Sequence, residues 1–116
     1  MLTKEQIKQI VDNHQLWLQT DSKEGQCADF SNVDLCGYTF ENVNLSYAKF
    51  NNALLNDAKF VHVTLYETSF YKACLRRVLI RFCDIGHTDF KSTEMRDAYI
   101  EYSQIHHADF SKSNLT

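Results

Sequence analysis

At 116 residues, the chain has room for one domain with a modest core. Its 12 Lys and Arg residues nearly balance 15 Asp and Glu residues, which gives a formal net charge of −3 at pH 7. This balance argues against direct nucleic-acid binding through a strongly basic surface, and it lacks the heavy negative charge of a strong DNA mimic. No apolar run approaches the roughly 20 residues of a membrane span, and the N-terminus lacks the apolar stretch of a signal peptide. We therefore expect a cytoplasmic protein that does not contact a membrane.

Residues 3 to about 20 are predicted to form an amphipathic helix. Thr3 followed by Gln6 is the signature of a capping box, in which the two residues satisfy each other's backbone N–H groups at the start of a helix. The side chains that follow with the spacing of one helical face are Ile7, Ile10, Val11, His14, Trp17 and Leu18. A helix this short is marginally stable alone, so we expect it to cover an open end of the structure that follows. The alternative is a helix that binds a partner or a membrane.

A polar turn is predicted from Asp21 to Gly25. It divides the chain into a capping segment, residues 1–25, and a second segment, residues 26–116. In the second segment a large apolar residue recurs at every fifth position. The series is Phe30, Leu35, Phe40, Leu45, Phe50, Leu55, Phe60, Leu65, Phe70, Leu75, Ile80, Ile85, Phe90, Met95, Ile100, Ile105, Phe110 and Leu115. A helix has a period near 3.6 and a strand a period of 2, so only a backbone that turns a corner every five residues keeps this series on its inner side.

Two residues before each large residue lies a smaller one. Seventeen of these eighteen positions hold Ala, Val, Ser, Thr or Cys, and only Tyr38 is bulky. A second period, of twenty residues, joins Phe30, Phe50, Phe70, Phe90 and Phe110. Because stacked coils pack without voids when their columns match in shape, the two periods predict an all-β solenoid with four sides and about 4.5 coils.

Several units of this series share a common form. Residues 27–31 are Cys-Ala-Asp-Phe-Ser and residues 108–112 are Ala-Asp-Phe-Ser-Lys. In these units the chain resembles the pentapeptide-repeat family, whose unit is often written Ala-Asp/Asn-Leu-x-x. The resemblance implies a right-handed quadrilateral parallel β-helix. It implies varied functions, since some members resemble duplex DNA in width and charge and inhibit or protect DNA gyrase.

The last units stay in register through Leu115. No capping segment is predicted beyond them, so we expect Ile105, Phe110 and Leu115 at an uncovered end of the solenoid. Exposed apolar side chains beside unpaired strand edges usually mark an interface. We therefore predict a tail-to-tail homodimer through the C-terminal coil, a mode that some pentapeptide-repeat proteins use.

One outward side of the predicted solenoid carries more apolar and aromatic residues than a surface exposed to water usually does. Residues twenty apart are vertical neighbours, so Leu79 lies beside Tyr99, and Phe82 beside Tyr102. With Arg81 at its edge, this group has the composition of a protein-binding hot spot. We predict that these five residues bind a protein partner.

The remaining outward groups do not predict a catalytic, cofactor or metal site. Four outward arginines could form an anion site: Arg76, Arg77, Arg81 and Arg96. Neighbouring carboxylates largely neutralise their charge, namely Glu94, Asp97 and Glu101. His87 and His107 share a column, but no third metal ligand is predicted beside them. Four cysteines without CxxC spacing, Cys27, Cys36, Cys74 and Cys83, are expected to be reduced thiols. Cys36 and Cys74 point outward at different heights, with no evident histidine base beside either.

These observations predict a non-enzymatic protein-binding module that presents the faces of a rigid rod to a macromolecular partner. The alternative is a DNA mimic that inhibits or protects a DNA-binding enzyme such as DNA gyrase. Against it, residues 26–116 carry eleven acidic and nine basic residues, which leaves a net charge of only −2. A third class is a structural unit without a dedicated partner.

Overall fold

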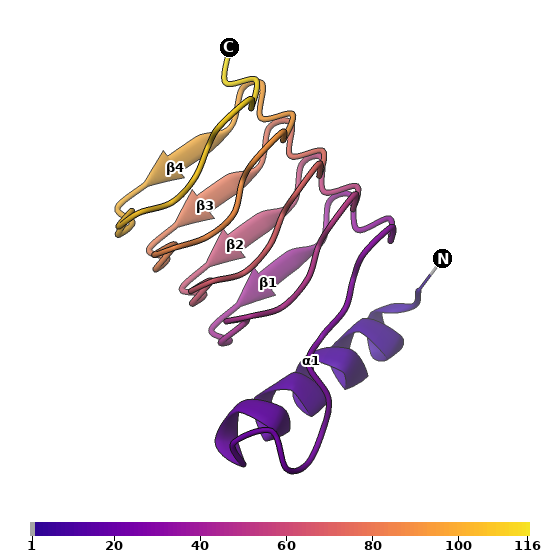
Figure 1. Cartoon of the computed structure of the whole chain (residues 1–116). Helices are drawn as coiled ribbons and strands as arrows, with labels where there is room; N and C mark the ends of the chain where they lie inside the picture. The colour runs from indigo at the N-terminus through magenta and orange to yellow at the C-terminus, as the bar shows by residue number, and fades with distance from the viewer. Residues whose placement is uncertain (1) are drawn as a thin grey trace.

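A single helix precedes a four-sided solenoid in the computed structural model, which describes residues 2–116 (Figure 1). Met1, part of the predicted capping segment 1–25, lies outside the described residues. The elements are α1 (Lys4–Gln19), β1 (Thr39–Glu41), β2 (Lys59–Val61), β3 (Leu79–Arg81) and β4 (Tyr99–Glu101). No helix within residues 2–116 combines the length and the apolar character needed to cross a membrane.

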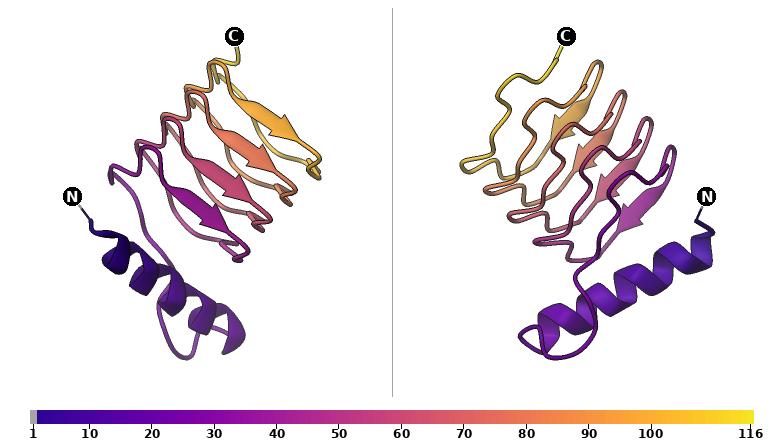
Figure 2. Two further views of the ribbon diagram at one scale, coloured as in Figure 1. Left: turned by 180° about the vertical axis from the view of Figure 1, so that it is seen from behind. Right: turned by 45° about the vertical axis from the view of Figure 1, so that its right-hand side comes forward.

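The strands recur every twenty residues and pair in parallel, in the order β1-β2-β3-β4. Phe40 pairs with Phe60, and Phe60 with Ile80, so each coil of four five-residue units supplies one strand. Parallel bridges on the other sides keep the same offset, for example between Asp29 and Lys49. Figure 2 shows the coils stacked along one axis. The predicted right-handed quadrilateral β-helix with an N-terminal capping helix is confirmed.

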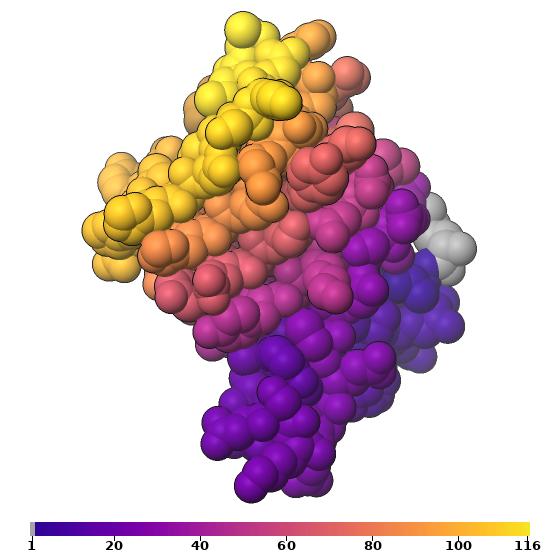
Figure 3. All heavy atoms as spheres, viewed as in Figure 1, coloured from indigo at the N-terminus to yellow at the C-terminus, as the bar shows by residue number. Residues whose placement is uncertain are grey.

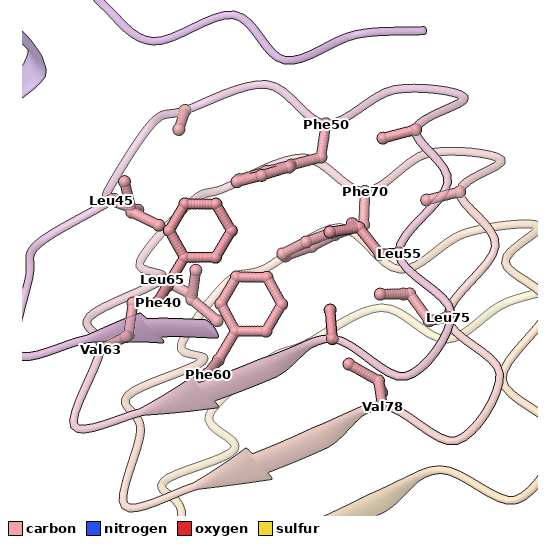
Figure 4. Close-up of a cluster of buried hydrophobic side chains, with 14 of the residues drawn as sticks. Phe40, Leu45, Phe50, Leu55, Phe60, Val63, Leu65, Phe70, Leu75 and Val78 are labelled. Carbon is pink, nitrogen blue, oxygen red and sulfur yellow. The ribbon is translucent and has the colours of Figure 1, made fainter. Parts of the chain in front are cut away.

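The core of the solenoid consists of columns of matched side chains (Figure 4). In one column, rings twenty residues apart stack with centroid distances of 4.9–5.2 Å, from Phe30 to Phe110. These distances are close to the separation of paired β-strands, so each ring fills the height of one coil. Small buried residues such as Ala53 and Ala58 lie between the columns, which explains why the position two before each large residue stays small.

Each corner of the solenoid requires a left-handed backbone residue. From Asn32 to Lys112, every fifth residue has a positive φ. A hydrogen bond from the Val33 N–H to the Phe30 carbonyl, at 3.2 Å, closes the turn around Asn32, and most other corners repeat it. Asparagine and glycine tolerate this conformation, whereas it costs most other residues roughly 1–2 kcal/mol. The same position is nevertheless aromatic at Tyr47, Phe82 and Tyr102, and its side chain points outward.

Helix α1 lies across the open end of the first coil, as predicted (Figures 1 and 2). The capping box is present: Gln6 donates its N–H to Thr3 Oγ1 at 3.1 Å, and the Thr3 N–H donates to Gln6 Oε1 at 2.8 Å. Ile7, Val11 and His14 are the buried residues of the helix. Ile10, Trp17 and Leu18, from the same predicted stripe, are only half-buried.

The opposite end of the rod carries exposed apolar side chains. In the space-filling view the coils follow one another as bands of colour, and the C-terminal residues form the end away from α1 (Figure 3). Ile105 and Leu115 are 49% and 57% exposed, while Phe110 and Ile100 are half-buried. The dimer-interface candidates therefore lie together on one end of the described chain.

Candidate binding surface

The predicted binding residues lie on the sheet face and on the corner beside it. Leu79 and Tyr99 are register partners at the start of β3 and β4, and Arg81 pairs with Glu101 at the strand ends. Tyr99 is 67% exposed, but Leu79 and Arg81 are half-buried. We call Leu79, Arg81 and Tyr99 the sheet patch. It offers less open surface than the sequence alone suggests.

Phe82 and Tyr102 belong to a stack of three rings at the corner. The Phe82 ring lies 4.9 Å from the His62 ring and 5.3 Å from the Tyr102 ring, with interplanar angles of 10° and 17°. Phe82 is 47% exposed and Tyr102 is 75% exposed. All three residues have positive φ values of 50–55°. We call His62, Phe82 and Tyr102 the corner stack; His62 was not among the predicted site residues.

A groove runs beside the corner stack. Its volume is about 460 Å³, and its second wall is a polar column formed by Thr64, Asp84 and Gln104. Val63 and Cys83, whose side chains point into the core, lie beneath it. The spacing of five residues could have indicated this groove. Each corner residue, such as Phe82, is followed two positions later by another outward residue, such as Asp84, so two outward columns run side by side.

A second aromatic strip borders the same side of the rod, and the sequence analysis did not identify it. The contacts run along the axis, with centroid distances of 6.3, 6.0, 5.5 and 4.9 Å between successive rings of Trp17, Tyr47, Tyr66, His87 and His107. The predicted stacking of His87 on His107 is part of it. Within residues 2–116, no three His, Cys, Asp or Glu side chains gather as a metal site would require.

The four outward arginines that were considered as an anion site each lie near a carboxylate, as the sequence analysis expects. Arg77 donates from Nε and Nη2 to the two carboxylate oxygens of Asp57, at 2.7 and 3.0 Å. These bonds hold the pKa of the Asp57 carboxyl below its ordinary value of 3.8. Asp57 lies one coil before Arg77, and Asp97, one coil after it, does not form this bond. The other arginines also have acidic neighbours: Arg81 bonds Glu101, and Arg76 and Arg96 lie 3.9 and 3.8 Å from Glu94. This pairing leaves little free positive charge for an anion.

Three of the four cysteines lie where burial disfavours the reactive thiolate form. Burial raises the pKa of the Cys27, Cys36 and Cys83 thiols, which favours the protonated form. Cys83 is buried, and its Sγ lies 3.2 Å from the Phe60 carbonyl oxygen, to which the thiol donates. Its role is therefore to satisfy a core carbonyl.

Five-residue units in register, coiled into a four-sided solenoid, define the class of pentapeptide repeat proteins. A model of this family, described as pentapeptide repeats in eight copies, matches residues 26–60, 44–81 and 80–116. The chain belongs to this family. No curated protein matches it.

Solved structures of pentapeptide repeat proteins match the chain at low sequence identity. QnrB1, a plasmid-mediated fluoroquinolone resistance protein, is 20% identical over 76% of the chain and 57% of its own, with a TM-score of 0.48. A protein of the Arabidopsis thaliana thylakoid lumen is 24% identical over 72% of the chain and 61% of its own, with a TM-score of 0.40. HetL from the cyanobacterium Nostoc sp. strain PCC 7120, involved in heterocyst differentiation regulation, is 15% identical over 89% of the chain, with a TM-score of 0.39. The chain spans 47% to 61% of the length of these proteins.

Proposed function

We propose that this protein is a non-enzymatic protein-binding module, and that the corner stack and the sheet patch contact its protein partner. The observation that carries the proposal is the corner stack. Three exposed rings occupy left-handed positions, where Asn or Gly would be less strained. The two ring pairs return roughly 0.5–1.5 kcal/mol each, which is less than the strain of three left-handed residues at roughly 1–2 kcal/mol each. Stability alone therefore gives little reason for the rings, whereas a partner-binding role does.

The composition of the surface supports the same function. Tyrosine and arginine are enriched where protein interfaces concentrate their binding energy, and Tyr99, Tyr102 and Arg81 lie within one side and its corner. The interior is filled by columns of Phe, Leu and Ile side chains, so the outer faces are what the rod offers to a ligand. A rigid solenoid also presents these side chains with little ordering cost on binding.

The test is a comparison of protein capture by matched variants. Wild-type protein and a Phe82→Ala, Tyr102→Ala double variant are used as baits in lysate of the native host, and bound proteins are quantified by mass spectrometry. Tyr71→Ala is the control, because Tyr71 is also exposed, at 39%, and lies outside both the corner stack and the sheet patch. We expect the double variant, but not Tyr71→Ala, to lose the captured partner. Equal capture by all three baits would refute the surface assignment.

A second candidate function follows from family membership: inhibition or protection of a DNA-binding enzyme such as DNA gyrase through DNA mimicry. The ion pairs on the rod argue against a uniformly negative surface. A gyrase supercoiling assay with micromolar protein decides this candidate. A change in supercoiling or in its inhibition by fluoroquinolones supports it, and no change in either removes it.

The exposed C-terminal end supports a tail-to-tail homodimer as the form of the protein that binds the partner. Ile105, Phe110 and Leu115 gather there, and β4 is the edge strand of the sheet. A dimer through this end would bring the two corner stacks onto one longer rod, since Tyr102 belongs to the last complete coil.

A further inference from the structure

We propose that the groove beside the corner stack receives a basic side chain, Arg or Lys, of the protein partner, and that Asp84 is the carboxylate that pairs with it. This inference rests on the proposed protein-binding function and deepens it by naming the chemistry of the bound group. It depends on three observations: the two unlike walls of the groove, the unpaired state of Asp84, and the charge of this side of the rod.

The two walls of the groove suit a side chain with an apolar stem and a polar head. His62, Phe82 and Tyr102 form the aromatic wall, and Thr64, Asp84 and Gln104 form the polar wall. At about 460 Å³, the groove falls within the usual volume range of ligand pockets, about 300–1,000 Å³. Lys and Arg place their methylene stems on apolar surface while the charged head reaches a polar partner. A purely apolar side chain would leave the polar wall without partners.

Asp84 differs from the aspartate at the matching position of the next unit. Both carboxylates accept a backbone hydrogen bond within their own turn, Asp84 from the Gly86 N–H at 2.9 Å and Asp89 from the Lys91 N–H at 2.8 Å. Asp89 also forms an ion pair with the Lys91 side chain at 3.7 Å. Glycine at position 86 removes that cation, and no cation elsewhere in residues 2–116 pairs with Asp84. A half-buried carboxylate is therefore left facing the groove without a counter-charge.

This side of the rod has no basic side chains other than the histidines His62, His87, His106 and His107. It is formed by residues 42–47, 62–67, 82–87 and 102–107, which contain no Lys or Arg. Their acidic residues are Glu67 and Asp84. The neighbouring Arg81 is engaged by Glu101. The negative charge of Glu67 and Asp84 therefore attracts a basic group to this side and repels an acidic one.

The experiment is an NMR titration of isotope-labelled protein with three short peptides, tetra-arginine, tetra-lysine and tetra-glutamate. We expect saturable shifts of the Phe82, Asp84 and Tyr102 amides with one or both basic peptides, and none there with tetra-glutamate. The comparison of the two basic peptides shows whether a guanidinium or an ammonium group is preferred. No saturable shift in the groove, or equal shifts with tetra-glutamate, would overturn the proposal.

Asp84→Asn is the decisive variant, because its amide oxygen can still accept the Gly86 N–H while the charge is gone. We expect its affinity for the basic peptide to fall about fivefold, as for one partly exposed ion pair. Asp97→Asn, an exposed carboxylate outside this side of the rod, is the matched control and should bind as the wild type does. Equal affinity of Asp84→Asn and the wild type would contradict the inference.

The capture assay separates this inference from the proposed function. If Phe82→Ala, Tyr102→Ala loses the partner and Asp84→Asn retains it, the surface assignment stands and the basic-group inference fails. If neither variant changes capture, the proposed function fails at this surface.

Discussion

Two phenylalanines show how the position within a five-residue unit decides what a residue does. Phe70 is completely buried and stacks on Phe50 and Phe90 at 4.9 and 5.1 Å. Phe82, twelve residues later, is 47% exposed at a corner and has a φ of 55°. The two rings have the same chemistry, but the Phe70 ring fills the core whereas the Phe82 ring lies on the surface.

Truncating these two residues should therefore have unequal effects on stability. We expect Phe70→Ala to lower the free energy of unfolding by about 3–5 kcal/mol, because it leaves a cavity between stacked coils. Phe82→Ala should lower it by only about 1–3 kcal/mol, because two surface ring pairs at roughly 0.5–1.5 kcal/mol each are lost. Denaturant unfolding followed by circular dichroism measures both. Similar losses for the two variants would contradict the assignment of Phe82 to the outer surface.

At the scale of the element, α1 takes the place that a preceding coil would occupy against the first coil. Gln15 pairs with both backbone groups of Asn44: its Nε2 donates to the carbonyl at 2.7 Å, and its Oε1 accepts the N–H at 3.3 Å. His14 accepts the Ala28 N–H at Nδ1, 2.9 Å away, and donates from Nε2 to the Ser46 carbonyl at 2.9 Å. The helix thus supplies side-chain partners to an edge that would otherwise remain unpaired.

His14 should make the stability of the protein depend on pH. Burial lowers the pKa of His14 below its ordinary value of 6.5, and protonation would place an Nδ1–H against the Ala28 N–H. Because the unfolded chain then binds the proton more readily, stability should fall as pH drops below about 6.5, by at most about 1.4 kcal/mol per pH unit. The loss ends below the folded-state pKa.

The measurement compares wild type and His14→Gln, which cannot titrate at this position, by denaturant unfolding between pH 7.5 and 5.5. The other histidines are present in both proteins, so the difference in slope reports His14. Identical slopes would show that the buried imidazole does not carry the effect.

Gln15→Ala should weaken the seal between α1 and the first coil. We expect a loss of about 1 kcal/mol in the free energy of unfolding and faster hydrogen exchange at the Asn44 amide, whose acceptor is removed. Gln19→Ala, an exposed position at the end of α1, is the control and should leave Asn44 protected. Unchanged exchange at Asn44 in Gln15→Ala would contradict the pairing.

At the scale of the whole molecule, each coil contacts chiefly its neighbours, so the first and last coils each have one side that no neighbouring coil covers. One end is covered by α1. The other exposes Ile105 and Leu115 beside the edge strand β4. Because only the C-terminal end is uncovered, the proposed dimer joins the two rods through their C-terminal ends.

A homodimer through the exposed end predicts a solution mass of twice 13.6 kDa at micromolar concentration, measured by light scattering. An Ile105→Asp, Leu115→Asp variant should return to 13.6 kDa, because charge at an apolar interface leaves buried carboxylates unpaired. Leu54→Asp places the same charge at an exposed leucine in the second coil, away from the C-terminal end, and should remain dimeric. A wild-type mass of 13.6 kDa across micromolar concentrations removes the dimer.

Most of the fold could be predicted from the sequence because its cause is local and repeated. Phe30 and Phe50 point inward for the same reason, a corner at every fifth residue, and twenty-residue columns follow without knowledge of any distant contact. The capping box was equally predictable, since Thr3 and Gln6 are three residues apart. The left-handed corners were missed, although Asn32, Gly37 and Asn42 are residues that tolerate them.

The five-residue period by itself determined the solenoid, its core columns and the outward direction of Phe82 and Tyr102, since side-chain direction in a regular coil depends on position alone. Only the tertiary structure decided the contacts of His14, which join residues 14 and 32 positions apart, because they depend on how α1 lies against the first coil. It also decided that Asp84 lacks a cation and borders a groove. Such relations depend on how neighbouring coils orient their side chains, which no period in the sequence records.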